Sequence, residues 1–174
     1  NEMNTIEANT LNSLYVAAKY LVSGDATNGY DVVVYASGIY KKFVPTTGDA
    51  ITTVKDLTVD KLVGNGHVEF DGITVTGTVT VLGGGSSSVV FLKSNLNNIV
   101  VDKKDVKVSF DAETTVAGEV VLGLNVLTET DKVVVETNNN NLNLIVNCSV
   151  EIKGTKTTAE LNLKVNKSVE ITTT

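Results

Sequence analysis

The sequence predicts a mainly β protein, a parallel β-solenoid (β-helix) with an N-terminal capping helix and a small hairpin, and three observations support this fold class. Strand formers dominate, because valine and threonine are abundant, aromatic residues make up only 5% of the 174 residues and Trp is absent. Apolar residues and threonines alternate from Ile73 to Val81, which is the period of a strand with one buried face. Strand-like segments then recur without an intervening helix, at spacings of 21 or 23 residues marked by Val79, Val100, Val121, Leu144 and Val165.

A β-sandwich is the alternative fold class, because its strands show the same alternation of buried and exposed positions. Two features favour the solenoid. The spacing of the strands is regular, and the two-residue turns that close hairpins are scarce after Gly72. We therefore interpret residues 56–174 as a solenoid of about five rungs.

The N-terminal residues show the one helical pattern in the chain. Apolar side chains fall on one broad face over residues 5–22, and Gly24 follows as a helix terminator. Such a helix either covers the open end of the sheet stack or packs on a neighbouring subunit. For the second role we name Leu11, Leu14 and Tyr15 as assembly residues.

Three short strand patterns follow this helix. Val32 to Tyr35 and Ile39 to Val44 flank Ala36 to Gly38, which predicts a hairpin, and Ile51 to Val54 is a third short strand. We therefore interpret residues 1–55 as a cap or an assembly element that precedes the solenoid.

The C-terminal residues continue in strand-like composition to the end of the sequence. Val169 and Ile171 alternate with polar residues, and neither a helix nor a charged cap follows them. The edge of a solenoid must be covered or paired with another chain. We therefore add Val169 and Ile171 to the predicted assembly residues.

The charge of the chain excludes several classes of partner. All 14 basic residues are Lys and the net charge is −6, whereas nucleic-acid binding needs clustered cations. No apolar run approaches the roughly 18 residues that span a bilayer, so we expect no membrane insertion. The single cysteine, Cys148, falls on the apolar parity of its strand and is interpreted as a core residue.

The stretch from Asp71 to Lys93, DGITVTGTVTVLGGGSSSVVFLK, joins a Val/Thr strand to a Gly- and Ser-rich corner and a second apolar strand. It resembles β-helical modules of Gram-positive cell-surface proteins, including S-layer-associated proteins. The resemblance covers residues 57–137 and rests on composition. It implies an extracellular, cell-surface module with a structural or adhesive role, and it implies no catalytic residues.

One acidic cluster offers oxygen ligands. Asp25, Asn28 and Asp31 are spaced three residues apart, and calcium takes six to eight oxygen ligands. The spacing matches no calcium-loop motif, so a solvated turn is the favoured reading and calcium the alternative. We expect no cofactor, with calcium at these residues as the one exception.

The function predicted from these features is that of a non-enzymatic, extracellular structural protein. It would be a secreted subunit or module that forms a homo-oligomer or polymer, as a surface layer or a filament. The alternative is an adhesive module that binds cell-wall or surface glycans. Its candidate aromatic residues are Tyr30, Tyr35 and Tyr40.

Overall fold

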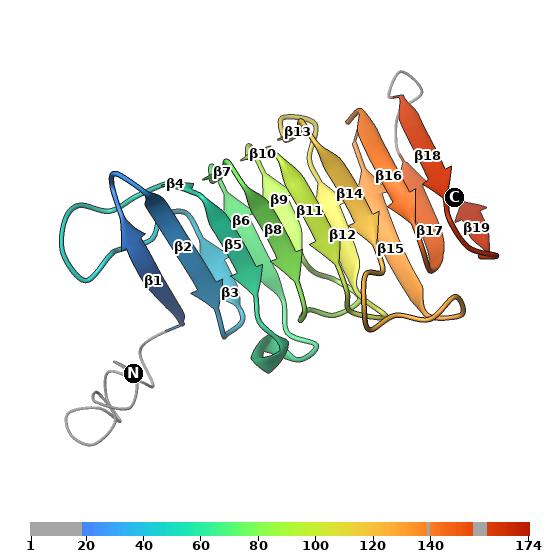
Figure 1. The fold of residues 1–174 in the computed structure, drawn as a ribbon, viewed down its shortest axis with the longest axis horizontal. Helices are drawn as coiled ribbons and strands as arrows, with labels where there is room; N and C mark the ends of the chain where they lie inside the picture. Colours follow the sequence, from blue (N-terminus) through green and yellow to red (C-terminus); the bar gives the residue numbers. More distant parts are fainter. Residues whose placement is uncertain (1–18, 139, 155–159) are drawn as a thin grey trace.

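The computed structural model describes residues 19–138, 140–154 and 160–174. Over these residues the chain forms a β-solenoid of about seven turns, which confirms the predicted fold class. Figure 1 shows the strands of successive turns stacked side by side in sequence order, from one end of the coil to the other. The corresponding strands pair in parallel, so each turn covers the interior of the turn before it.

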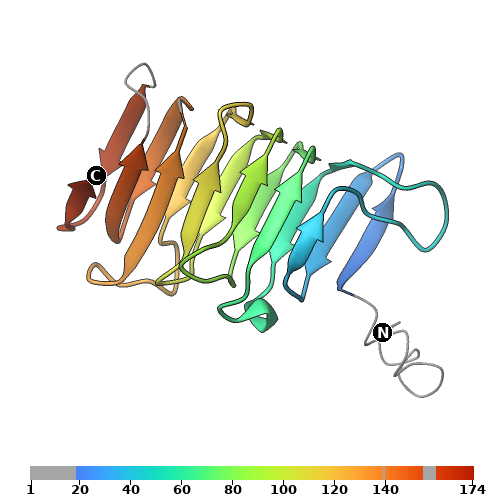
Figure 2. The same cartoon turned by 180° about the vertical axis from the view of Figure 1, so that it is seen from behind.

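Three sheets form the walls of the coil. The first sheet faces the viewer in Figure 1 and the second faces the viewer in Figure 2. The eight strands of the first sheet are, in order, β1 (Tyr20–Asp25), β2 (Gly29–Val34), β5 (Asp56–Val59), β8 (Thr78–Val81), β11 (Asn98–Val101), β14 (Glu119–Leu122), β16 (Leu142–Val146) and β18 (Leu161–Val165). The seven strands of the second are β3 (Gly38–Tyr40), β6 (Val68–Asp71), β9 (Val90–Leu92), β12 (Lys107–Phe110), β15 (Lys132–Thr137), β17 (Ser149–Gly154) and β19 (Ile171–Thr173).

A short third sheet closes the early turns. Its strands are β4 (Thr53–Val54), β7 (Thr74–Val75), β10 (Asn95–Leu96) and β13 (Thr115–Val116). A 3₁₀ helix, η1 (Lys61–Val63), protrudes from the corner between β5 and β6.

Alternation along each strand produces the core. In β8, Val79 and Val81 are buried while Thr78 and Thr80 are only half-buried. The same parity recurs in the strands stacked above and below, so apolar residues of successive turns meet inside the coil. Burial of this kind stabilises a fold by about 1.5–3 kcal/mol for each fully buried aliphatic or Phe side chain.

An aromatic stack runs along the inside of the second sheet. Tyr40, Phe70, Phe91 and Phe110 occupy the same register in β3, β6, β9 and β12. The rings of Phe70 and Phe91 stack with centroids 5.3 Å apart, and those of Phe91 and Phe110 are 5.8 Å apart. In β15 the position is taken by Thr137, where the stack ends.

The register of the turns differs from the predicted one by one residue at Val100 and Val121 and by two residues at Val165. Val79 pairs with Ile99 and not with Val100, because Val79 and Ile99 are fully buried whereas Val100 points outward. The positions that stack are Val79, Ile99, Val120, Leu144 and Leu163. A slip of one residue moves a side chain to the other face of a strand, so burial decides the register where similar β-branched residues stand side by side.

The N-terminal part of the coil also differs from prediction. The described end of the predicted helix, Tyr20 to Val22, is in strand β1, which pairs antiparallel with β2. The hairpin therefore closes at Asp25 to Gly29, and the predicted hairpin at Ala36 to Gly38 is wrong. That segment is a corner, because Gly38 N donates to the next turn, to the carbonyl of His67 at 3.0 Å.

The parallel coil begins before residue 56, where the sequence analysis placed its start. Strand β2 pairs in parallel with β5, β3 with β6, and β4 with β7. The segment before residue 56 thus contributes a full turn, which was missed because its strands were assigned to a hairpin.

The Gly- and Ser-rich stretch forms a corner, as predicted. A Cβ on Gly83 would collide with the carbonyl oxygen of Asp60, and one on Gly85 with that of Asn65. Ser88 is buried and donates to the carbonyl of Gly66 at 2.7 Å. Glycine is needed here because the backbones of neighbouring turns approach closely.

Candidate assembly edge

The last turn of the coil leaves its inner face uncovered by any described residue. Leu163 in β18 is in register with Leu144 in β16, yet Leu163 is 41% exposed and Leu144 is fully buried. Val165 is 47% exposed, although its partner Val146 is fully buried. Exposed side chains at positions that are buried elsewhere in the coil form an apolar surface of the kind that marks an interaction site.

Strand β19 shows the same change on the second sheet. Ile171 is 36% exposed, whereas Val150, its partner in β17, is 1% exposed. Val169 is half-buried and packs against the core. Of the two predicted C-terminal assembly residues, Ile171 thus lies on the open inner face, and Leu163 and Val165 were missed. The signal that could have identified them is that Leu163 and Val165 alternate with polar residues in the same way as Leu144 and Val146, which point into the core.

The backbone of the last turn is a sheet edge. Strand β18 pairs only with β16, and β19 pairs only with β17, among the described strands. In a parallel strand about half of the N–H and C=O groups point to each side, so an edge strand presents a row of free donors and acceptors. We call the inner face and free edge of β18 and β19 the open rung.

Asparagine side chains continue this pairing on the outer face. Asn162 Nδ2 donates to Asn143 Oδ1 at 2.9 Å, and Asn166 Nδ2 donates to Asn147 Oδ1 at 2.9 Å. Each amide donates to the turn before it, so the oxygens of Asn162 and Asn166 are the terminal acceptors among the described residues. A further strand with Asn at these positions would extend both ladders.

On the outer face of the second sheet, by contrast, Glu136 and Glu151 form ion pairs with lysines of the same sheet. Glu151 lies 2.7 Å from Lys132 Nζ and 3.5 Å from Lys153 Nζ. The hydrogen bond from Lys132 lowers the pKa of Glu151, and it raises the pKa of Lys132. Next to it, Glu136 accepts from Lys107 at 3.1 Å. The exposed apolar side chains of the open rung thus lie next to an outer face whose named charges are already paired.

At the opposite end of the described coil the interior is filled, although β1 and β3 are edge strands there. Strand β1 covers the edge of β2, and an aromatic cluster of Tyr20, Tyr40 and Phe43 fills the interior there. Tyr40 donates to the carbonyl of Ala36 at 2.6 Å, and Tyr20 accepts the N–H of Val44 at 3.0 Å. The two ends of the described coil thus differ in chemistry.

The remaining predicted assembly residues, Leu11, Leu14 and Tyr15, lie outside the described residues. No helix in the described part of the chain is long and apolar enough to cross a membrane. The described segments also contain no group of three or more His, Cys, Asp or Glu side chains placed to hold a metal ion.

The calcium candidates are arranged around the β1–β2 hairpin. Asp25 accepts the N–H of Thr27 and of Asn28, both at 2.8 Å, and the amide of Asn28 as well. These bonds lower the pKa of Asp25 and close the turn. Asp31 is on β2, opposite Ser23 and beside Asp56. The first two candidates therefore interact with each other as turn residues.

Two other residues singled out by the sequence are in the interior. Tyr40 is buried in the aromatic cluster, where burial raises its pKa to about 12, so it is not part of a glycan-binding surface with Tyr30 and Tyr35. Cys148 is a fully buried core residue, as predicted, and burial raises the pKa of its thiol to about 11.

No protein family, curated protein or solved structure matches this chain. The structure confirms the β-solenoid that the resemblance implied, and none of these comparisons connects the chain to Gram-positive surface proteins. Any functional interpretation depends on the surfaces of the coil itself.

Proposed function

We propose that the chain is a non-enzymatic structural subunit or module that assembles through its open rung into a filament or a surface layer. Its location is extracellular, at the cell surface. The resemblance of Asp71 to Lys93 to surface-protein modules supports that location.

One observation carries the proposal. Leu163, Val165 and Ile171 pair with Leu144, Val146 and Val150, which are buried in the turn before, yet the three are exposed in the last turn. Covering a Val, Leu or Ile side chain fully is worth about 1.5–3 kcal/mol, and the free backbone groups of β18 and β19 gain partners at the same time. A strand from a second copy supplies both.

The contact is heterologous, because the open rung of one copy meets a different surface of the next. Head-to-tail contacts of this kind close into a ring or continue as an open filament, depending on the rotation between copies. The opposite end, with β1 as its edge strand, is the surface on the neighbouring copy that continues the first sheet.

The test compares three proteins by light scattering and negative-stain microscopy over a concentration series. We expect the wild type to grow in mass with concentration and to form filaments or sheets. The variant Leu163→Lys/Val165→Lys places two charges on the open rung and should remain monomeric. Leu62→Lys/Leu124→Lys is the matched control, because it adds the same two charges at side chains that are 65% and 58% exposed, away from both ends of the coil.

Thermal unfolding should be nearly unchanged in both variants, since all four positions are exposed. A wild type that stays monomeric throughout the series would contradict the proposal. So would a doubly substituted variant that assembles as the wild type does.

A further inference from the structure

A cavity of about 440 Å³ lies on the corner between the first and second sheets, away from the open rung. Four successive turns line it: η1 after β5, and the corners after β8, β11 and β14. Figure 1 shows η1 and the loop after β14 protruding at the same edge of the coil, with the shorter corners between them. The cavity has the size of a small-molecule site, for which about 300–1,000 Å³ is typical.

The apolar part of the lining comes from three side chains. Leu82 and Leu127 are half-buried and buried, and Val126 is 70% exposed. Leu62 and Leu124 are also more than half exposed and lie in the same two protruding segments. An apolar surface in a concave setting favours a ligand with an apolar body.

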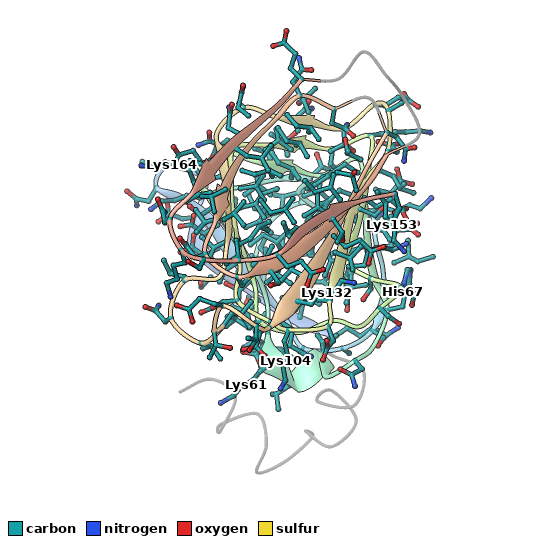
Figure 3. The ribbon with its side chains drawn as sticks, turned by 90° about the vertical axis from the view of Figure 1, so that its right-hand side faces the viewer. Lys61, His67, Lys104, Lys132, Lys153 and Lys164 are labelled. Atoms are coloured by element: carbon teal, nitrogen blue, oxygen red, sulfur yellow. The ribbon has the colours of Figure 1, made fainter. Side chains whose placement is uncertain are left out.

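Three lysines line the same cavity. Lys103 Nζ donates to Asn65 Oδ1 at 3.3 Å and to the carbonyl of Lys104 at 3.0 Å. Lys104 Nζ lies 3.9 Å from Asp131 Oδ1. The Nζ of Lys61 has no hydrogen-bond or ion-pair partner among the described residues. Figure 3 shows Lys61 and Lys104 at one corner of the coil, well away from Lys153 and Lys164.

The two carboxylates in the lining are engaged with the backbone of the loop after β14. Asp102 accepts N–H bonds from Leu124 to Leu127 at 3.0–3.3 Å. Asp131 accepts the N–H and the hydroxyl of Thr128, both at 2.9 Å. With three lysines and two such carboxylates, the lining carries a formal charge of +1, and its lysines remain the groups that can pair with a ligand.

We propose that this corner cavity binds a small amphiphilic anion, a single carboxylate, sulfonate or phosphate group carried on an apolar body. The anionic group pairs with Lys61, Lys103 and Lys104. The apolar body covers Leu82, Val126 and Leu127. This site is independent of the assembly proposed for the open rung.

The test titrates the wild-type protein with decanoate and follows methyl resonances by two-dimensional NMR. We expect saturable shifts at Leu82, Val126 and Leu127, and none at Leu163 or Val165. Decanol lacks the charge and inorganic phosphate lacks the apolar body. Each should therefore bind at least about fivefold more weakly than decanoate, which is the largest effect expected of one exposed ion pair.

The variant Lys61→Gln/Lys103→Gln/Lys104→Gln should bind decanoate about tenfold more weakly, because each exposed ion pair contributes roughly a two- to fivefold effect. Lys41→Gln/Lys153→Gln/Lys164→Gln removes the same charge elsewhere and should bind as the wild type does. Equal affinities for the two variants would overturn the proposal. Shifts confined to Leu163 and Val165, or equal binding of decanol, would overturn it too.

Discussion

Replacing Asp102 by Asn tests how the loop after β14 is held to the turn beneath it. Oδ1 of Asp102 accepts the N–H groups of Leu124 and Leu127, at 3.0 and 3.3 Å. Oδ2 accepts the N–H of Asn125 at 3.0 Å, and Val126 N lies within 3.2 Å of both oxygens. An amide has the same shape as the carboxylate but turns an NH₂ group toward donors that need an acceptor.

The size of the effect follows from the burial of the groups involved. Asp102 is buried and the N–H of Leu127 belongs to a buried residue, whereas Leu124, Asn125 and Val126 are exposed and can bond to water. A hydrogen bond to a charged group is worth about 1.5–3 kcal/mol, and a buried donor left unpaired costs a similar amount. We therefore expect Asp102→Asn to lower the free energy of unfolding by about 2–3 kcal/mol.

The assay is urea unfolding followed by circular dichroism, with Asp105→Asn as the control. Asp105 is exposed and has a positive φ of 58°, which Asn accepts readily, so the control should change stability by less than about 0.5 kcal/mol. If both variants lower the free energy of unfolding by the same small amount, the carboxylate of Asp102 does not hold the loop.

The same variant should alter the pH dependence of stability. Burial acts to raise the pKa of Asp102, but the N–H bonds from Leu124 to Leu127 outweigh it and the pKa is lowered. The ionised carboxylate therefore stabilises the fold above the ordinary Asp pKa of about 3.9, and this stabilisation is lost as pH falls through the lower pKa of the folded state. The difference in the free energy of unfolding between the wild type and Asp102→Asn should therefore become smaller in acid. A difference that does not change with pH would refute the reasoning.

Two further predictions concern the core. Phe91→Ala should lower the free energy of unfolding in urea by about 3–5 kcal/mol, because Phe91 is fully buried between Phe70 and Phe110. The control Ile39→Ala should lower it by less than about 0.5 kcal/mol, because Ile39 is exposed. Similar losses for the two variants would show that the aromatic stack is not a core element. Cys148 should be inert to Ellman's reagent in the native protein and should react at once in guanidinium, because its thiol is buried and its pKa is raised to about 11. Fast reaction of the native protein would place Cys148 at an accessible surface.

Most of the fold could be predicted from local sequence patterns. The alternation in Ile73 to Val81 and the spacing of the later strands are properties of single turns, and both are visible in the sequence. Register was less predictable, because Ile99 and Val100 are both apolar and β-branched, and only stacking on Val79 distinguishes them.

The features that sequence reasoning missed depend on contacts between turns. Asp102 looks like a solvated turn residue, and its role appears only when the corner of the next turn is placed above it. The amide ladder between Asn143 and Asn162 likewise joins residues of successive turns. Sequence reasoning located the C-terminal edge through Ile171, but the exposure of Leu163 follows from the absence of a described turn above it.

Hydrogen–deuterium exchange on dilute and concentrated wild-type protein tests the open rung most directly. Pairing of β18 and β19 with a second copy would protect their free backbone amides. We predict slower exchange in peptides from residues 160–174 at high concentration, with unchanged exchange in β8 and β11. Assembly of the protein with no added protection in residues 160–174 would contradict the account.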